Sequence, residues 1–196
     1  MMRHLHRLRQ NSEGATIVEF AIVAPVFLLL LIGSFDLGHT LYVRSALQGA
    51  LQDAGRGSGL EGGVDNQQAI DDYVAAQVMA VAPKARLTFD RRNYAEFSDV
   101  GTPEDFVDAN NIGVYDEGEC FTDENGNGQW DSDVGAEGQG GADDVVVYRV
   151  DVAFERSFPL WKMLGLGHEA QLSATTTLRN QPFGTQEART SETICP

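Results

Sequence analysis

The feature that most constrains this chain is an apolar run near its N-terminus. Residues 15–35 contain a single charged side chain, Glu19. At the rise of an α-helix they span about 31 Å, which is close to the thickness of the hydrocarbon core of a bilayer. The basic residues Arg3, Arg7 and Arg9 precede the run. The sequence therefore predicts one membrane-spanning helix, with the N-terminus in the cytoplasm and the head of the protein outside it.

The chain beyond this run is acidic, and its charge excludes one class of partner. The formal net charge is −15, and no Lys or Arg lies between Arg92 and Arg149. Proteins that bind nucleic acid need clustered basic side chains, so no nucleic-acid partner is expected. The four histidines are scattered, and no Ser or Cys has the neighbours of an activated nucleophile. The sequence therefore indicates that the protein is not an enzyme.

A short pattern at the start of the apolar run has a chemical interpretation. Gly14 precedes Ala15, and Glu19 and Phe20 follow inside the run. An ordinary secretory signal also has a basic start and an apolar core, but a carboxylate inside that core is costly. The glycine gives a peptidase access to the backbone, and the acid requires a positive partner, such as the freed α-amino group of a neighbouring copy. The pattern predicts a processing site made of Gly14, Ala15, Glu19 and Phe20.

These residues resemble the processing site of type IV prepilins, which a membrane aspartic peptidase cuts after the glycine. The wider segment, residues 14–56, resembles the TadE-like family of the tight-adherence (Flp) pilus system in its glycine, its glutamate, Pro25 and an amphipathic helix after the membrane run. The resemblance implies a minor pilin or pseudopilin in the inner (cytoplasmic) membrane, with a periplasmic or extracellular head, that helps to assemble a filament for surface attachment. It implies the prepilin peptidase, other pilins or pseudopilins, Tad secretion-assembly proteins and membrane lipid as partners.

Three other interpretations of the same residues stay open. In the first, the anchor retains its leader uncut, and Gly14 is not a cleavage site. In the second, the helix serves only as a tether for a non-polymerising calcium-binding or sensor module. A membrane-tethered hydrolase is the third, although the sequence offers no catalytic pattern for it.

Hydrophobic periodicity predicts the elements of the fold. Apolar residues recur at helical spacing beyond the membrane, so the first helix is expected to continue to about Arg56, where glycines stop it. Residues 65–82 have the pattern of a capped amphipathic helix that ends at Pro83. Alternating apolar and polar residues predict strands within the three segments 85–91, 146–154 and 171–179.

The predicted fold class is α+β. A long N-terminal transmembrane helix continues into an amphipathic helix, and a pilin-like head follows in which a second helix packs on an antiparallel sheet. The predicted organisation is a basic prepilin-type leader (residues 1–14), the long helix (15–56) and an exported acidic head (57–196). The apolar segment 158–166, between two predicted strands, is interpreted as core packing, with a hairpin lobe or a partner contact as alternatives. Asp36 and His39, just beyond the membrane run, are interpreted as part of a solvated helix face, and capping or pairing with a neighbouring helix is the alternative.

The Asn/Gly/Asp-rich loop of residues 120–144 contains a calcium-binding pattern. An EF-hand-like loop places oxygen ligands at alternate positions around a tight glycine turn at position 6, here Gly128, and this suits a hard cation. The residues at positions 1, 3, 5, 7 and 9 are Asp123, Asn125, Asn127, Gln129 and Asp131. A calcium ion is therefore a predicted cofactor, and the alternative is a polar Asn-Gly hairpin turn without a cation.

The calcium pattern is incomplete at position 12. This position holds Val134 instead of the usual bidentate glutamate. A last ligand has to come from one of the nearby carboxylates: Asp133, Glu137, Asp143 or Asp144.

The two cysteines, Cys120 and Cys195, lack the CxxC spacing of metal sites and redox dithiols. In an exported head a disulfide is the leading interpretation. Its closure of a long loop is worth about 4 kcal/mol in the chain-entropy treatment. Two unpaired thiols and an intermolecular bridge are the alternatives.

Overall fold

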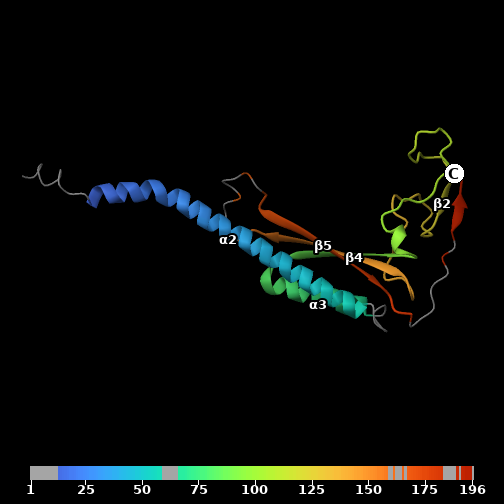
Figure 1. Cartoon of the computed structure of the whole chain (residues 1–196), viewed down its shortest axis with the longest axis horizontal. Helices are drawn as coiled ribbons and strands as arrows, with labels where there is room; N and C mark the ends of the chain where they lie inside the picture. Colours follow the sequence, from blue (N-terminus) through green and yellow to red (C-terminus); the bar gives the residue numbers. More distant parts are fainter. Residues whose placement is uncertain are drawn as a thin grey trace, which may run out of the picture. The chain divides into compact units, whose positions relative to one another are not determined.

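The structure is a computed structural model, shown in Figure 1. It describes residues 13–58, 66–158, 161, 165, 167–182, 189 and 191–195. The basic part of the predicted leader, the first residue of the predicted second helix, Asp65, and most of the apolar segment 158–166 lie outside these residues. The chain divides into two compact units. One comprises Met1–Tyr42 and Glu155–Ala170, and the other comprises Val43–Phe154 and Gln171–Pro196.

The N-terminal helix is long and continuous, as predicted. Helix α2, Glu13–Ser58, has 46 residues and runs through Pro25 without interruption (Figure 1). Its stretch Thr16–Gly57 is, among the described residues, the one helix that is long and apolar enough to cross a membrane. Most of the large apolar side chains of the membrane run are exposed in the single chain, as lipid-facing side chains are expected to be.

The later part of α2 supplies one side of the head's core. Its buried residues recur at helical spacing and are Val43, Leu47, Ala50, Leu51 and Ala54. Leu37 and Leu41, which continue the same periodic pattern toward the membrane run, are exposed. The buried stripe of this helix therefore begins only at Val43.

The second helix, α3, spans Gln67–Val81 and buries Val74 and Val78. It has the predicted position and ends just before the predicted stop at Pro83. The predicted capping is wrong in one respect, because the N-cap residue Asn66 makes no side-chain capping hydrogen bond.

A four-stranded sheet has the order β3-β1-β4-β5. Its strands are β1 (Arg86–Tyr94), β3 (Ala136–Glu137), β4 (Val145–Glu155) and β5 (Glu169–Arg179). Strands β1 and β4 are antiparallel, with Arg86 opposite Ala153 and Tyr94 opposite Val145. One face of β4 is buried and consists of Val146, Tyr148, Val150, Val152 and Phe154. The three predicted strands and the α+β class are thus confirmed.

The acidic region between β1 and β4 contains short elements that periodicity did not predict. They are the 3-10 helix η1, Phe97–Asp99, and the strands β2, Phe121–Asp123, and β3. Strand β2 pairs with β6, Glu192–Ile194, in a separate two-stranded sheet. This pairing brings the C-terminal residues to the Asn/Gly/Asp-rich loop.

Candidate functional site

The predicted processing residues occupy the first turns of α2. Gly14 is exposed, and a Cβ atom built on it meets no other atom within 4 Å. The backbone after Gly14 is therefore sterically open. Glu19 and Phe20 are also exposed on the helix surface. Because an ionised carboxylate in lipid is costly, Glu19 is a group that requires a partner once α2 lies in a bilayer.

The end of the membrane run carries an ion pair that the sequence analysis did not predict. The Nη1 of Arg156 lies 2.7 Å from Oδ2 of Asp36. The two side chains are only 23% and 16% exposed, respectively. Asp36 is therefore not part of a solvated helix face, and the interpretation from sequence was wrong.

Four of the predicted calcium ligands lie together at the end of β2 and in the loop that follows it. Asp123 is buried, and its carboxylate accepts the backbone N–H groups of Gly126 and Gly128, each at 2.7 Å. Both glycines have positive φ, of 79° and 78°, which bends the chain tightly around the carboxylate. The side-chain amides of Asn125 and Asn127 both donate to Oδ2 of Asp131, at 2.8 Å and 2.5 Å.

The fifth predicted ligand, Gln129, is placed differently. Its side chain is exposed, and its backbone N–H donates to Oδ1 of Asn127 at 2.7 Å. In an EF-hand-like loop position 7 uses its backbone carbonyl, so an exposed side chain is compatible with that role. In the described part of the chain no three His, Cys, Asp or Glu side chains form a group that can hold a metal ion. Besides the carboxylates of Asp123 and Asp131, a cation in this loop would rely on amide and backbone oxygens, and the two asparagine amides would have to turn their oxygens inward.

Three of the four carboxylates near position 12 are engaged elsewhere in the head, and the fourth, Glu137, is exposed on β3. Asp133 accepts the hydroxyl of Tyr94 at 3.0 Å, and burial followed by this hydrogen bond raises the pKa of Tyr94 to about 12. Asp144 is buried and lies 3.4 Å from Arg189. Asp143 lies 3.8 Å from Arg179.

The residue that organises the loop is Glu104, which the sequence analysis missed. It is 1% exposed, and its two carboxylate oxygens accept the backbone N–H groups of Glu124 at 2.9 Å and Asp131 at 3.0 Å. Its backbone carbonyl accepts the indole N–H of Trp130 at 3.0 Å. Glu104 thus forms hydrogen bonds with both ends of the loop, at Glu124 and at Asp131. No local pattern around an acid that follows Pro103 indicates this role.

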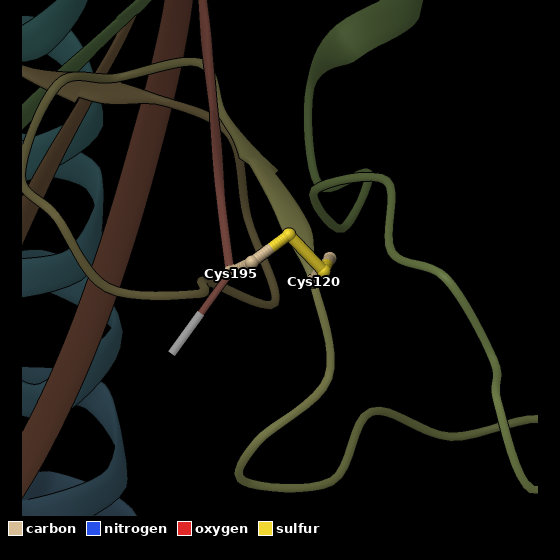
Figure 2. Close-up of a disulfide and its surroundings, with 2 residues drawn as sticks. All are labelled: Cys120 and Cys195. Atoms are coloured by element: carbon tan, nitrogen blue, oxygen red, sulfur yellow. A yellow bond between two sulfur atoms is a disulfide. The ribbon is translucent and has the colours of Figure 1, made fainter.

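The structure contains the predicted disulfide between Cys120 and Cys195 (Figure 2), with an S–S distance of 2.07 Å. Beside it, β2 and β6 pair with Phe121 opposite Ile194 and Asp123 opposite Glu192. The bond therefore fastens the C-terminal strand to the start of the loop that holds the predicted calcium ligands.

Comparison with protein families identifies one similarity. Residues 14–56 match the family described as TadE-like protein. Comparison with curated proteins and with solved structures found no match to the chain. The matched residues begin at the predicted processing glycine and end two residues before the end of α2, so the similarity covers the helix and not the rest of the head. Residues 14–56 of this chain are therefore a TadE-like segment.

Proposed function

We propose that the chain is a minor pilin or pseudopilin that helps to assemble a tight-adherence (Flp-type) pilus. The observation that carries the proposal is the coincidence of the TadE-like match with a single membrane-type helix that begins next to Gly14. Only one charge, Glu19, interrupts the apolar run of that helix. A helix used merely as a tether has no need of a carboxylate at this depth, since the carboxylate makes insertion less favourable.

The proposed mechanism is lateral packing of helices after processing. Cleavage after Gly14 leaves Ala15 with a free α-amino group at the membrane surface. Glu19 of one copy then accepts this amine of a neighbouring subunit, and the attraction compensates for removing the carboxylate from water. The role is structural, and no residue of the chain is assigned to catalysis.

The location and the partners follow from this mechanism. The chain spans the inner membrane once, with its N-terminus in the cytoplasm and its acidic head in the periplasm or outside the cell. The prepilin peptidase acts on the Gly14–Ala15 bond. Other pilins or pseudopilins and the Tad secretion-assembly proteins pack against the helix.

Processing and packing have separate expected results. In cells that contain the peptidase, mass spectrometry of the purified chain is expected to find Ala15 as the mature N-terminus. The Glu19→Gln variant removes the charge but keeps the shape of the side chain. The amount of this variant that is retained with the pilus proteins when they are co-purified is expected to fall about tenfold. A tenfold fall corresponds to a loss of about 1.4 kcal/mol of pairing free energy.

The matched control is Glu13→Gln, an acid on the other side of the processing glycine, which is expected to leave retention unchanged. An intact Met1 or Met2 terminus would show that the anchor stays uncut. Normal retention of Glu19→Gln would contradict the packing mechanism while leaving processing in place.

We further infer that the loop of residues 123–131 binds calcium. The support is the convergence of Asp123, Asn125, Asn127 and Asp131, with Gly128 at the tight turn. With so few charged ligands the dissociation constant is expected in the millimolar range of extracellular modules. The same property would also serve the alternative role of a non-polymerising calcium-binding or sensor module.

Isothermal titration of the full chain in detergent, stripped with chelator, tests the calcium site. Asp131→Asn removes the one carboxylate that faces both asparagine amides. Titration of this variant with calcium is therefore expected to give no heat of binding. Asp116→Asn, an exposed acid outside the loop, serves as the control and is expected to titrate like the unmodified chain. Absence of heat from the unmodified chain would leave the polar hairpin turn as the correct interpretation.

A further inference from the structure

The ion pair between Asp36 and Arg156 determines where the connection between β4 and β5 begins relative to the membrane span. Asp36 is the first residue after the apolar run, so it lies at the head-side boundary of the membrane span. Arg156 directly follows β4, and its guanidinium donates to Asp36 at 2.7 Å. The backbone N–H of Arg156 also donates to the carbonyl of His168, at 2.9 Å, which closes the base of the connection. The base of the connection therefore lies at the edge of the bilayer.

The sequence of this connection is unlike that of a solvated loop. Residues 157–167 include Phe158, Trp161 and four further large apolar residues, and the single charged residue among them is Lys162. Among the described residues of the segment, Phe158 and Trp161 are half-buried and Gly165 and Gly167 are exposed. Neither Phe158 nor Trp161 belongs to the buried core.

We propose that Trp161, in the connection between β4 and β5, makes a second membrane contact and lies among the lipid headgroups of the head-side leaflet. A tryptophan ring has an apolar body and one polar N–H, and such rings concentrate at the membrane–water interface. The ring centroids of Trp161 and His168 are 5.7 Å apart, so the indole lies beside the first residues of β5. The ion pair places this pair of rings at the membrane boundary.

Lipid is favoured over a protein partner by location and by charge. Glu155–Ala170 form one compact unit with the N-terminal helix up to Tyr42, which contains the membrane run. The chain as a whole carries a formal charge of −15, whereas the charge within the connection is that of a lysine. Lipid phosphates attract a cation and repel carboxylates, so this connection is suited to approach the bilayer. The inference depends on α2 crossing the membrane and does not depend on the chain assembling into a pilus.

Tryptophan quenching in lipid tests the proposal on the full chain. The chain contains two tryptophans, so Trp130→Phe leaves Trp161 as the one reporter. In nanodiscs whose lipids carry a nitroxide just below the headgroup, Trp161 is expected to lose most of its emission. The matched variant Trp161→Phe leaves Trp130, which stacks on Tyr115 at 4.6 Å, and its emission is expected to be unaffected.

A second experiment tests whether the ion pair between Asp36 and Arg156 holds Trp161 at the membrane. Adding Arg156→Gln to the Trp130→Phe chain removes the attachment to Asp36, so less quenching of Trp161 is expected. Arg149→Gln is the control, because Arg149 is an exposed arginine of the same strand that pairs with Asp151. It is expected to leave the quenching unchanged.

Two results would overturn the proposal. One is that the lipid nitroxide quenches Trp161 no more than Trp130. The other is that Trp161 is protected from the lipid nitroxide until the chain is diluted into excess empty lipid, which would mean that a second copy covers it. Because Trp130 donates to Glu104, its replacement can loosen the head, so the unmodified chain is also tested with photoactivatable phospholipid. Crosslinks are expected on residues 157–168 in addition to 15–35, and their absence from 157–168 would refute the contact.

Discussion

Replacing Asp71 by Asn is expected to lower the free energy of unfolding by about 3–5 kcal/mol, because it leaves a buried cation without its counter-ion. Asp71 on α3 receives two hydrogen bonds from the guanidinium of Arg91 on β1, at 3.0 Å and 2.5 Å. The side chains of Arg91 and Asp71 are 8% and 15% exposed, respectively, so solvent screens the pair only weakly. The change is measured by chemical denaturation of the full chain in detergent, followed by tryptophan fluorescence.

A tyrosine of the central strand β4 also contacts both members of the pair between Asp71 and Arg91. The hydroxyl of Tyr148 donates to Asp71 at 2.6 Å, and the guanidinium carbon of Arg91 lies 4.1 Å from the centre of the Tyr148 ring. Burial, followed by the hydrogen bond to Asp71, raises the pKa of Tyr148, so the phenol remains a donor. An asparagine at position 71 keeps one acceptor oxygen for three donors, two N–H groups of Arg91 and the hydroxyl of Tyr148, and removes the charge that balances Arg91.

The matched control is the neighbouring residue on the same helix. Asp72 is exposed, and its carboxylate accepts the side-chain amide of Gln68 at 3.0 Å. Asp72→Asn is expected to change the free energy of unfolding by no more than about 0.5 kcal/mol. Equal denaturation midpoints for the two variants would contradict the role assigned to Asp71.

Periodicity predicted the elements whose side chains alternate between the core and solvent. Helix α3 and the strands β1, β4 and β5 each have a face that is apolar over several residues, and this regularity is visible in the sequence. The elements that periodicity missed, β2, β3, β6 and η1, have two or three residues each, so they are too short to display a period.

The same limit applies to the candidate sites. The calcium pattern was visible because its predicted ligands lie within nine consecutive residues, and their convergence follows from glycines that adopt positive φ. Glu104 acts on this loop from about twenty residues away. Asp36 and Arg156 are separated by 120 residues. Such contacts depend on the complete fold, and a single sequence carries no local signal for them.

Removing the disulfide by Cys120→Ser with Cys195→Ser is expected to lower the free energy of unfolding by about 4 kcal/mol in the chain-entropy treatment, given a sequence separation of 75. Most of this effect acts on the unfolded chain, which gains conformations when the long loop opens. The folded chain changes locally, because β6 pairs with β2 over three residues only, and so short a pairing is marginal without a covalent bond. Hydrogen exchange is therefore expected to accelerate at Glu192–Ile194 and to remain slow in β1 and β4.

The control for the disulfide prediction is the unmodified chain after reduction, which has the same cysteines without the bond. It is expected to unfold at the same denaturant concentration as the double variant, and its mass is expected to rise by two protons on reduction. If the oxidised and reduced chains unfold together, the bond does not stabilise the head. If only the serine variant is unstable, the loss comes from the substituted side chains and not from opening the loop. The two measurements together assign the stability to the covalent closure between the acidic loop and the C-terminal strand, because the residues of β6, Glu192–Ile194, are the same in every variant.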